Sequence, residues 1–176
     1  MAPTPDLSGT LKFELSSGTI TLDAEQRVLL FPAELLAPLS ATEAGLASLR
    51  SFGVSLGAAA RSMGAASPEE AVTSLSAQLA RAGFGRIGLE RWGALLAVRF
   101  AGAPDTLTQE AQVAFLEGLM NGISERESAL YYVEDRFLVL DPSVAAALRE
   151  RGARGEFQRL SEVIAALVQR KDGRIS

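Results

Sequence analysis

A helical stretch that contains four glycines, residues 44–64 (AGLASLRSFGVSLGAAARSMG), constrains this chain more than any other feature. Each glycine inside a helix costs about 0.5–1 kcal/mol relative to alanine. Gly53 and Gly57 lie four residues apart and therefore share one face, which Ala60 and Gly64 continue. A face of small residues lets another backbone approach closely. We therefore predict that this is the central helix and that it packs tightly against the sheet or against a second copy of the chain.

Segments of alternating and of periodic apolar residues predict a mixed α and β fold. Residues 11–22 show two alternating runs around residues 16–18, which is the pattern of a hairpin. Further strands are predicted at residues 27–31, 86–91, 92–100, 129–133 and 136–140. Further helices are predicted at residues 68–82, at residues 109–123 and beyond residue 141.

Three of the predicted helices begin with capping residues. Ser67 is followed by Pro68 at the first helical position, and Glu70 completes a capping box. Thr42 is the predicted N-cap of the glycine-bearing helix, and Asp141 stands before a proline in the same way as Ser67 does.

The residue types that are absent exclude several classes of function. The chain has no cysteine, which excludes disulfides, thiolate metal sites and cysteine nucleophiles. It has no histidine either, which removes the commonest general base, metal ligand and haem ligand. We therefore expect a protein that is not an enzyme and that holds no metal and no cofactor.

The charge and the terminal residues bear on partners and location. The net charge of −4 argues against non-specific nucleic-acid binding. Residues 141–176 carry seven basic and five acidic side chains, net +2, which leaves −6 for residues 1–140. The first residues have neither the basic nor the apolar region of a signal peptide, and no apolar run approaches the roughly 18 residues of a membrane span. A cytoplasmic protein is expected.

Two motifs have simple structural interpretations. Residues 83–88 (GFGRIG) match the G-x-G-x-x-G of dinucleotide-binding folds, but that site needs a strand before the motif and a helix after it. Here a predicted helix precedes and a predicted strand follows, so we interpret the motif as a turn. Glu125, Glu127, Glu134 and Asp135 alternate with arginines and lack calcium-loop spacing, so they are expected to form a solvated rim.

Two interpretations of the aromatic residues stay open, because the segments expected to enclose the core carry them. They are ordinary core residues, or they line an apolar pocket. The predicted pocket residues are Phe52, Leu56, Phe84, Trp92, Phe115 and Leu119. Beyond residues 151–155, apolar residues recur at helical spacing, which indicates an amphipathic terminal helix. The predicted interface residues are Gly53, Gly57, Phe157, Leu160, Ile164 and Leu167.

The order of these segments resembles the 4-vinyl reductase-type domain, which is related to the TRAPP subunits of vesicle tethering. The resemblance covers about residues 26–141 and lies in VLLFPAELL, SLRSFGVSLG, GFGRIGLE, AFLEGLMNGIS and RFLVLD. It implies an α+β fold with a small antiparallel sheet packed against a layer of helices, and dimers formed through helices. The chain departs from many bacterial members because it lacks their cysteines near the C-terminal strands.

The resemblance also implies a domain organisation and two functions. Residues 1–25 are a leader and hairpin, residues 26–141 the domain, and residues 142–176 a helical C-terminal extension. TRAPP members act as scaffolds, so our leading hypothesis is a non-enzymatic scaffold that forms homo- or heterodimers with protein partners. Bacterial members bind small hydrophobic molecules, so the alternative is a sensor or accessory domain. Its ligand is expected between the residue 44–64 helix and the residue 109–123 helix.

Overall fold

The computed structural model describes residues 11–14, 16–17, 19–22, 26–28, 33–93, 95–157 and 159–171. The chain divides into two units, residues 1–35 and residues 36–176. In the N-terminal unit, β1 (Leu11–Glu14), β2 (Thr19–Leu22) and β3 (Gln26–Val28) form an antiparallel sheet in that order. The predicted hairpin is thereby confirmed. β3 pairs with β2, although we predicted that the residues of β3 open the second domain. Residues 29–31 of that predicted strand lie outside the described residues.

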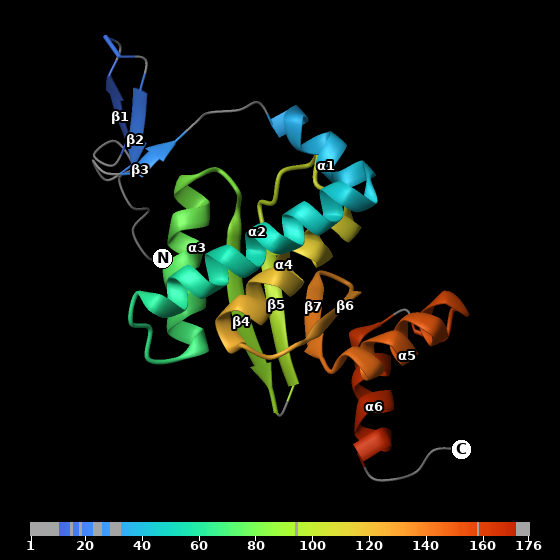
Figure 1. Ribbon diagram of the computed structural model, residues 1–176. Coiled ribbons are helices and arrows are strands. Elements are labelled where there is room, and N and C mark those ends of the chain that lie inside the picture. The colour runs from blue at the N-terminus through green and yellow to red at the C-terminus, as the bar shows by residue number, and fades with distance from the viewer. Residues whose placement is uncertain are drawn as a thin grey trace. The chain divides into compact units, whose positions relative to one another are not determined.

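The C-terminal unit combines a layer of helices with a four-stranded sheet, as the sequence predicts (Figure 1). The short 3-10 helix η2 (Ala33–Leu36) ends at the first residue of this unit. The elements that follow are α1 (Ala37–Ala41), α2 (Glu43–Ser62), α3 (Pro68–Arg81), β4 (Arg86–Trp92), β5 (Leu95–Ala101), α4 (Gln109–Ser124), β6 (Ala129–Val133), β7 (Arg136–Leu140), α5 (Pro142–Ala153) and α6 (Leu160–Lys171). The sheet has the order β4-β5-β7-β6, and all neighbouring strands are antiparallel. No helix among the described residues is both long and apolar enough to cross a membrane.

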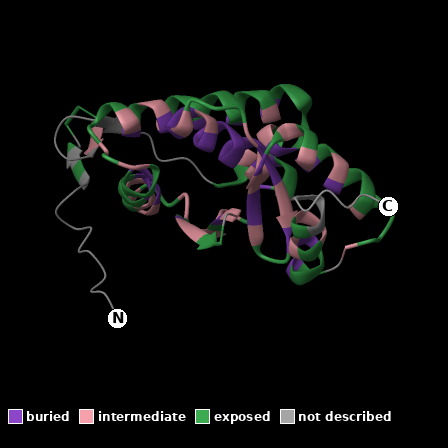
Figure 2. Cartoon of the chain, turned by 90° about the horizontal axis from the view of Figure 1, so that it is seen from below, coloured by how far each residue is buried: buried purple, intermediate pink, exposed green. Residues whose placement is uncertain are grey.

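Both faces of this sheet are covered by helices. Successive residues of a strand point to opposite sides of the sheet, so they belong to different cores. Val98 and Phe137 belong to the core that the sheet shares with α2, α3 and α4. Their neighbours Ala97 and Leu138 belong to a second core, which the sheet shares with α5 and α6. Figure 2 shows the buried residues where the helices and the strands meet. The C-terminal extension is therefore an integral layer of this unit.

The glycine face of α2 packs against α4, and the contact is made by four glycines. A Cβ atom added at Gly53 would lie 2.8 Å from the backbone nitrogen of Leu119, and one at Gly57 would lie 2.9 Å from that of Ile123. Gly118 and Gly122 of α4 approach the backbone of α2 equally closely. The close packing is confirmed, but its partner is neither the sheet nor a second copy: it is a helix of the same chain.

We predicted that α2 is the central helix, but α4 is the more deeply buried of the two. Phe115, Leu116 and Leu119 of α4 have no exposed surface, whereas Phe52 and Val54 of α2 lie on the surface. α2 therefore forms an outer layer, and α4 lies in the interior beside the sheet.

The predicted helix starts are confirmed by their hydrogen bonds. The hydroxyl oxygen of Thr42 accepts from the backbone of Gly45 at 3.1 Å, and that of Ser67 accepts from Glu70 at 3.2 Å. The Glu70 carboxylate accepts in turn from the backbone of Ala66, the residue before the cap. Asp141 caps α5 by accepting from the next residue but one, at 2.9 Å.

The apolar residues of the extension pack within the chain. Leu160 is buried in the second core, and the other predicted interface residues of this segment, Phe157, Ile164 and Leu167, lie partly buried against the same core. The stripe that we predicted as an interface therefore covers the outer face of the chain's own sheet. An amphipathic pattern shows that a helix packs on something, but it does not show on what.

Candidate functional site

Four phenylalanines gather on one flank of α4. The Phe115 ring lies 5.2 Å from that of Phe84, 6.0 Å from that of Phe52 and 6.1 Å from that of Phe100, measured between ring centroids. These separations are typical of interacting aromatic pairs. We call these residues the phenylalanine cluster. It combines side chains of α2, α4 and β5 with Phe84, which lies between α3 and β4.

The turn after α3 explains how Phe84 reaches this cluster. Gly83 has φ +72°, a left-handed conformation that favours glycine. The backbone N–H of Phe84 donates to the carbonyl oxygen of Leu79 at 2.8 Å, which closes the α3 end as in a Schellman motif. The residue after such a glycine is commonly apolar and packs on the helix. The GFGRIG segment is thus a turn between a helix and a strand, as predicted, and it positions an aromatic ring.

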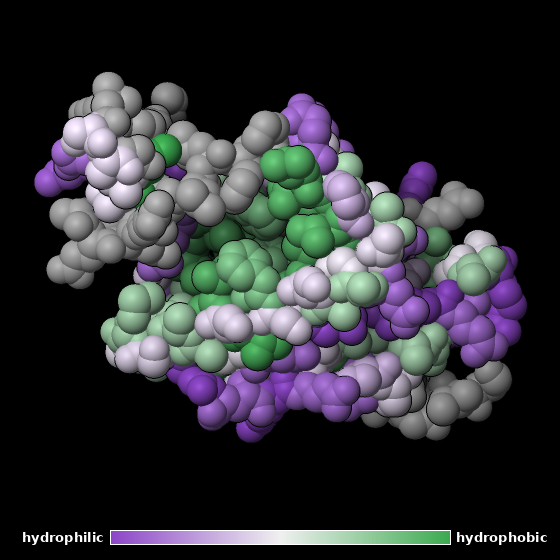
Figure 3. All heavy atoms as spheres, turned by 45° about the horizontal axis from the view of Figure 1, so that its top comes forward, coloured by the Kyte–Doolittle hydropathy of each residue, from purple (hydrophilic) through white to green (hydrophobic). Residues whose placement is uncertain are grey.

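The phenylalanine cluster is open to the surface on its α2 side. Phe52 is 48% exposed, Phe84 and Phe100 are partly buried, and Phe115 is fully buried. Figure 3 shows apolar residues gathered on the helical face. Such a surface can hold a small apolar molecule against aromatic rings.

The predicted pocket residues are only partly brought together. Phe52, Phe84 and Phe115 meet in the cluster, and Leu56 and Leu119 belong to the same core. Trp92 is the last residue of β4, at the end of the strand away from Phe84, and it is 40% exposed. Phe100 completes the cluster, although we left it out of the predicted pocket.

The space between α2 and α4 does not hold a ligand along the glycine contact. A methyl group alone would collide there with the backbone of the facing helix. The same glycines that bring the helices together leave no room for a ligand along this line of contact.

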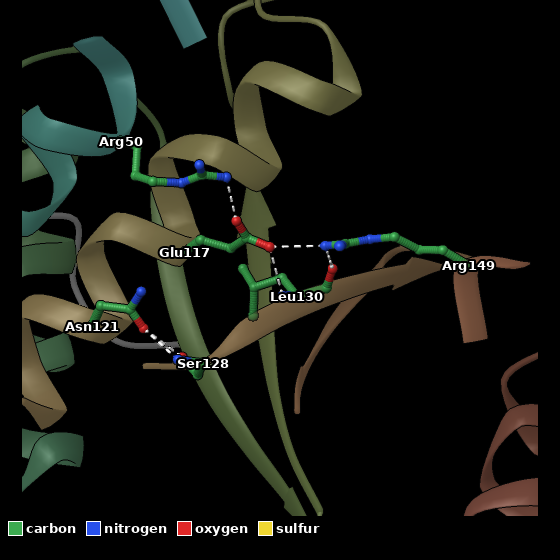
Figure 4. Close-up of polar contacts among 6 residues, drawn as sticks. All are labelled: Arg50, Glu117, Asn121, Ser128, Leu130 and Arg149. Atoms are coloured by element: carbon green, nitrogen blue, oxygen red, sulfur yellow. Dashed lines mark hydrogen bonds and ion pairs between the residues drawn. The ribbon is translucent and has the colours of Figure 1, made fainter. Parts of the chain in front are cut away.

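The opposite flank of α4 carries a cleft of about 560 Å³, lined by residues of α2, α4, β6 and α5. Glu117 lies in it with a side chain that is only 7% exposed. Its carboxylate accepts from Arg50 Nη2 at 2.5 Å, from Arg149 Nη2 at 2.9 Å and from the backbone N–H of Leu130 at 2.9 Å. Figure 4 shows the carboxylate between the two guanidinium groups. We call these three side chains the Arg50–Glu117–Arg149 triad.

The triad ties four elements together. Arg149 Nη2 also donates to the carbonyl oxygen of Leu130 at 2.8 Å, so α5 is fastened to both α4 and β6. One turn along α4, Asn121 accepts from the backbone and the hydroxyl of Ser128 just before β6. The triad was not predicted from the sequence. Its one signal was a lone carboxylate in the apolar run VAFLEGLMNGI, where a buried charge needs a partner.

Two tyrosines of β6 flank the same cleft. Tyr131 and Tyr132 both line it, and burial raises the pKa of the Tyr131 phenol above its usual value. A tyrosine phenol is protonated at neutral pH, so it can donate a hydrogen bond.

The remaining candidate acids lie on the surface. Glu125, Glu134 and Asp135 are exposed, and Glu125 pairs with Arg61 at 2.6 Å. Within the described residues, no three acidic side chains come together in a way that would hold a metal ion. The exposure of these side chains and the Arg61–Glu125 ion pair agree with the expected solvated rim.

Comparisons with known proteins give a likeness of fold. No protein-family model matches the chain, and no curated protein matches it. Among solved structures, the phenol-responsive sensory domain of the transcription activator PoxR, crystallised with phenol, is similar with a TM-score of 0.51 and 16% sequence identity. The match covers 76% of this chain and 85% of that domain. At this identity the likeness shows a shared fold.

Proposed function

We propose that the C-terminal unit is a non-enzymatic sensory or accessory module that binds a small hydrophobic molecule at the phenylalanine cluster. The observation that carries the proposal is an aromatic cluster that reaches the surface, with Phe52 at 48% exposure, instead of closing over itself. The fold shared with a phenol-responsive sensory domain supports it. We also propose that this unit belongs to the 4-vinyl reductase-type family of domains.

The chemistry of the cluster favours a flat aromatic or otherwise apolar ligand. Each well-placed pair of aromatic rings contributes about 0.5–1.5 kcal/mol beyond the burial of its surface. A ligand on Phe52, Phe84 and Phe100 also removes apolar surface from water. For a molecule the size of phenol, these terms correspond to dissociation constants in roughly the micromolar to millimolar range.

Two measurements test this proposal. Native mass spectrometry of gently purified protein is expected to show a reproducible small-molecule adduct. Calorimetric titration with toluene and with phenol is expected to show binding that Phe84→Ala weakens at least about tenfold. Trp92→Ala is the matched control, because it removes an aromatic ring at the far end of β4 and is expected to leave binding unchanged. Equal binding by the wild type and Phe84→Ala, or no binding by the wild type, contradicts the proposal.

The scaffold hypothesis has lost one of its supports, because the stripe of the extension packs on the chain's own sheet. It stays a prediction, and the structure sharpens its test. Truncation at residue 156 would remove Leu160 and Val163 from the second core and destabilise the unit, so it cannot separate folding from docking. Val168→Glu changes an exposed apolar residue of α6 instead. Loss of a protein partner with unchanged stability would favour the scaffold.

A further inference from the structure

The cleft beside Glu117 has the size and the lining of a ligand site that is separate from the phenylalanine cluster. Its volume of about 560 Å³ lies within the roughly 300–1,000 Å³ of small-molecule pockets. Leu46, Val113 and Leu130 give it apolar surface, and charged groups converge on the same space. Phe115 and Glu117 are two residues apart on α4, so the two sites lie on opposite sides of that helix.

The triad favours one negative group at its end of the cleft, although the lining as a whole, with Glu43 and Glu110, carries a net charge of −1. Arg50 and Arg149 together carry +2 and Glu117 carries −1, so the triad has a net charge of +1. The arginine side chains are 53% and 49% exposed, and both line the cleft. Each guanidinium has five N–H donors in a planar fork that matches a carboxylate. The contacts to Glu117 use Nη2 of each arginine, so donors are left for a ligand.

The rim of the cleft sets an upper limit on that charge. Glu43 and Glu110 also line it, and both side chains are exposed. A nucleotide or another polyanion would meet these carboxylates, whereas a single carboxylate can sit between the guanidinium groups. The apolar surface and the two tyrosines then suit a hydrophobic or aromatic body.

We propose that this cleft binds a small monocarboxylate with an apolar body, held by Arg50 and Arg149 above the buried Glu117. Arg149 belongs to α5, so the ligand contacts the C-terminal extension directly. Binding is thereby expected to strengthen the attachment of α5 to β6. This inference does not rest on the phenylalanine cluster, and the two sites differ in the charge of the ligand that they take.

The test uses benzoate as the probe and benzamide as its neutral counterpart, titrated into the full chain by calorimetry at low and high salt. Benzoate is expected to bind at least about tenfold more tightly than benzamide, and more weakly at high salt. Arg149→Met and Arg50→Met are each expected to weaken benzoate binding at least about tenfold. Glu43→Gln is expected to tighten it, because it removes a negative charge from the rim.

Arg154→Met is the matched control, since Arg154 is an exposed arginine next to the end of α5 whose ion pairs with Glu150 and Glu156 lie outside the cleft. It is expected to leave benzoate binding unchanged. Far-UV circular dichroism checks that each variant is folded, and Arg50→Met decides the question if Arg149→Met is not.

Three results would overturn the inference. The first is equal binding of benzoate and benzamide, and the second is equal binding of benzoate by the folded arginine variants and the wild type. The third is loss of benzoate binding in Phe84→Ala with no loss in the arginine variants, which would assign benzoate to the phenylalanine cluster. That third result would leave the proposed function standing. If Phe84→Ala loses toluene binding but keeps benzoate binding, the two ligands bind at separate sites, as proposed.

Discussion

The contact between α2 and α4 predicts that a single added methyl group is destabilising. In Gly53→Ala the new Cβ atom would lie 2.8 Å from the backbone nitrogen of Leu119 and closer still to the carbonyl oxygen of Phe115. Normal contacts are about 3.5–4.0 Å, so the helices must separate by about 1 Å. The obstacles are backbone atoms inside a helix, which cannot rotate away as a side chain does.

The magnitude follows from two opposing terms. Overpacking a well-packed core typically costs about 1–3 kcal/mol, and a rigid obstacle places this case at the upper end. Alanine is the better helix former by about 1 kcal/mol. We therefore expect Gly53→Ala to lower the free energy of unfolding by about 2 kcal/mol. Gly118→Ala should behave alike, because its Cβ would lie 2.8 Å from the carbonyl carbon of Arg50.

The double variant supplies the sharper test. Gly53→Ala and Gly118→Ala widen the same gap, so the second change costs little once the first has separated the helices. The double variant is expected to be destabilised by about 1–2 kcal/mol less than the sum of the single variants. Urea unfolding followed by circular dichroism at 222 nm measures this difference. The signal reports on the C-terminal unit, because the described helices from α1 onward all lie in residues 36–176.

Gly88→Ala is the control for these glycine substitutions. Gly88 lies in β4 with open space around its would-be Cβ atom and without a left-handed φ, so alanine is expected to be neutral or slightly stabilising. Two results would contradict these expectations: Gly53→Ala is as stable as Gly88→Ala, or the double variant shows simple additivity. The first result would mean that the two helices separate freely, contrary to the close contact in the structure, and the second would mean that the two substitutions do not share one gap.

Three further outcomes are expected. Ser67→Ala should lower the free energy of unfolding by about 1 kcal/mol in the same urea assay, because it removes the cap of α3. Glu134→Gly should raise it by about 0.5–1 kcal/mol, since Glu134 has φ +56° in the β6–β7 turn. The hydrogen bond from Arg91 lowers the pKa of Glu69. This pair therefore stabilises the fold at pH values above the ordinary pKa of a glutamate, and its contribution to stability is lost as the pH falls through the lowered pKa. In Arg91→Gln, the pKa of Glu69 measured by NMR should return towards its ordinary value; an unchanged pKa would contradict this cause.

The elements of this fold could be predicted because their signals are local. Alternating residues placed β6 and β7 at the bounds that the structure has, and the capping pattern at Ser67 placed the start of α3. These signals depend on a few neighbouring residues. In a cap or a strand pair, the hydrogen bonds that form directly satisfy the polar groups of the backbone.

The partners of the elements could not be predicted in the same way, because a face of small residues or an apolar stripe specifies no partner. The missing information was partly present in a second segment. Gly118 and Gly122 repeat the spacing of Gly53 and Gly57, and two matching faces in one chain favour contact with each other. The triad was less accessible, since its arginines are 67 and 32 residues away from Glu117.

The glycine contact also explains why the candidate sites lie where they do. Because α2 and α4 touch through their backbones at Gly53 and Gly118, larger side chains on either side are pushed to the flanks. On one flank this exposes aromatic rings around Phe115, and on the other it brings Arg50 over Glu117. A variant that separates the helices should therefore disturb both flanks at once. We expect Gly118→Ala to weaken toluene and benzoate binding together, whereas Phe84→Ala and Arg149→Met should each affect only one.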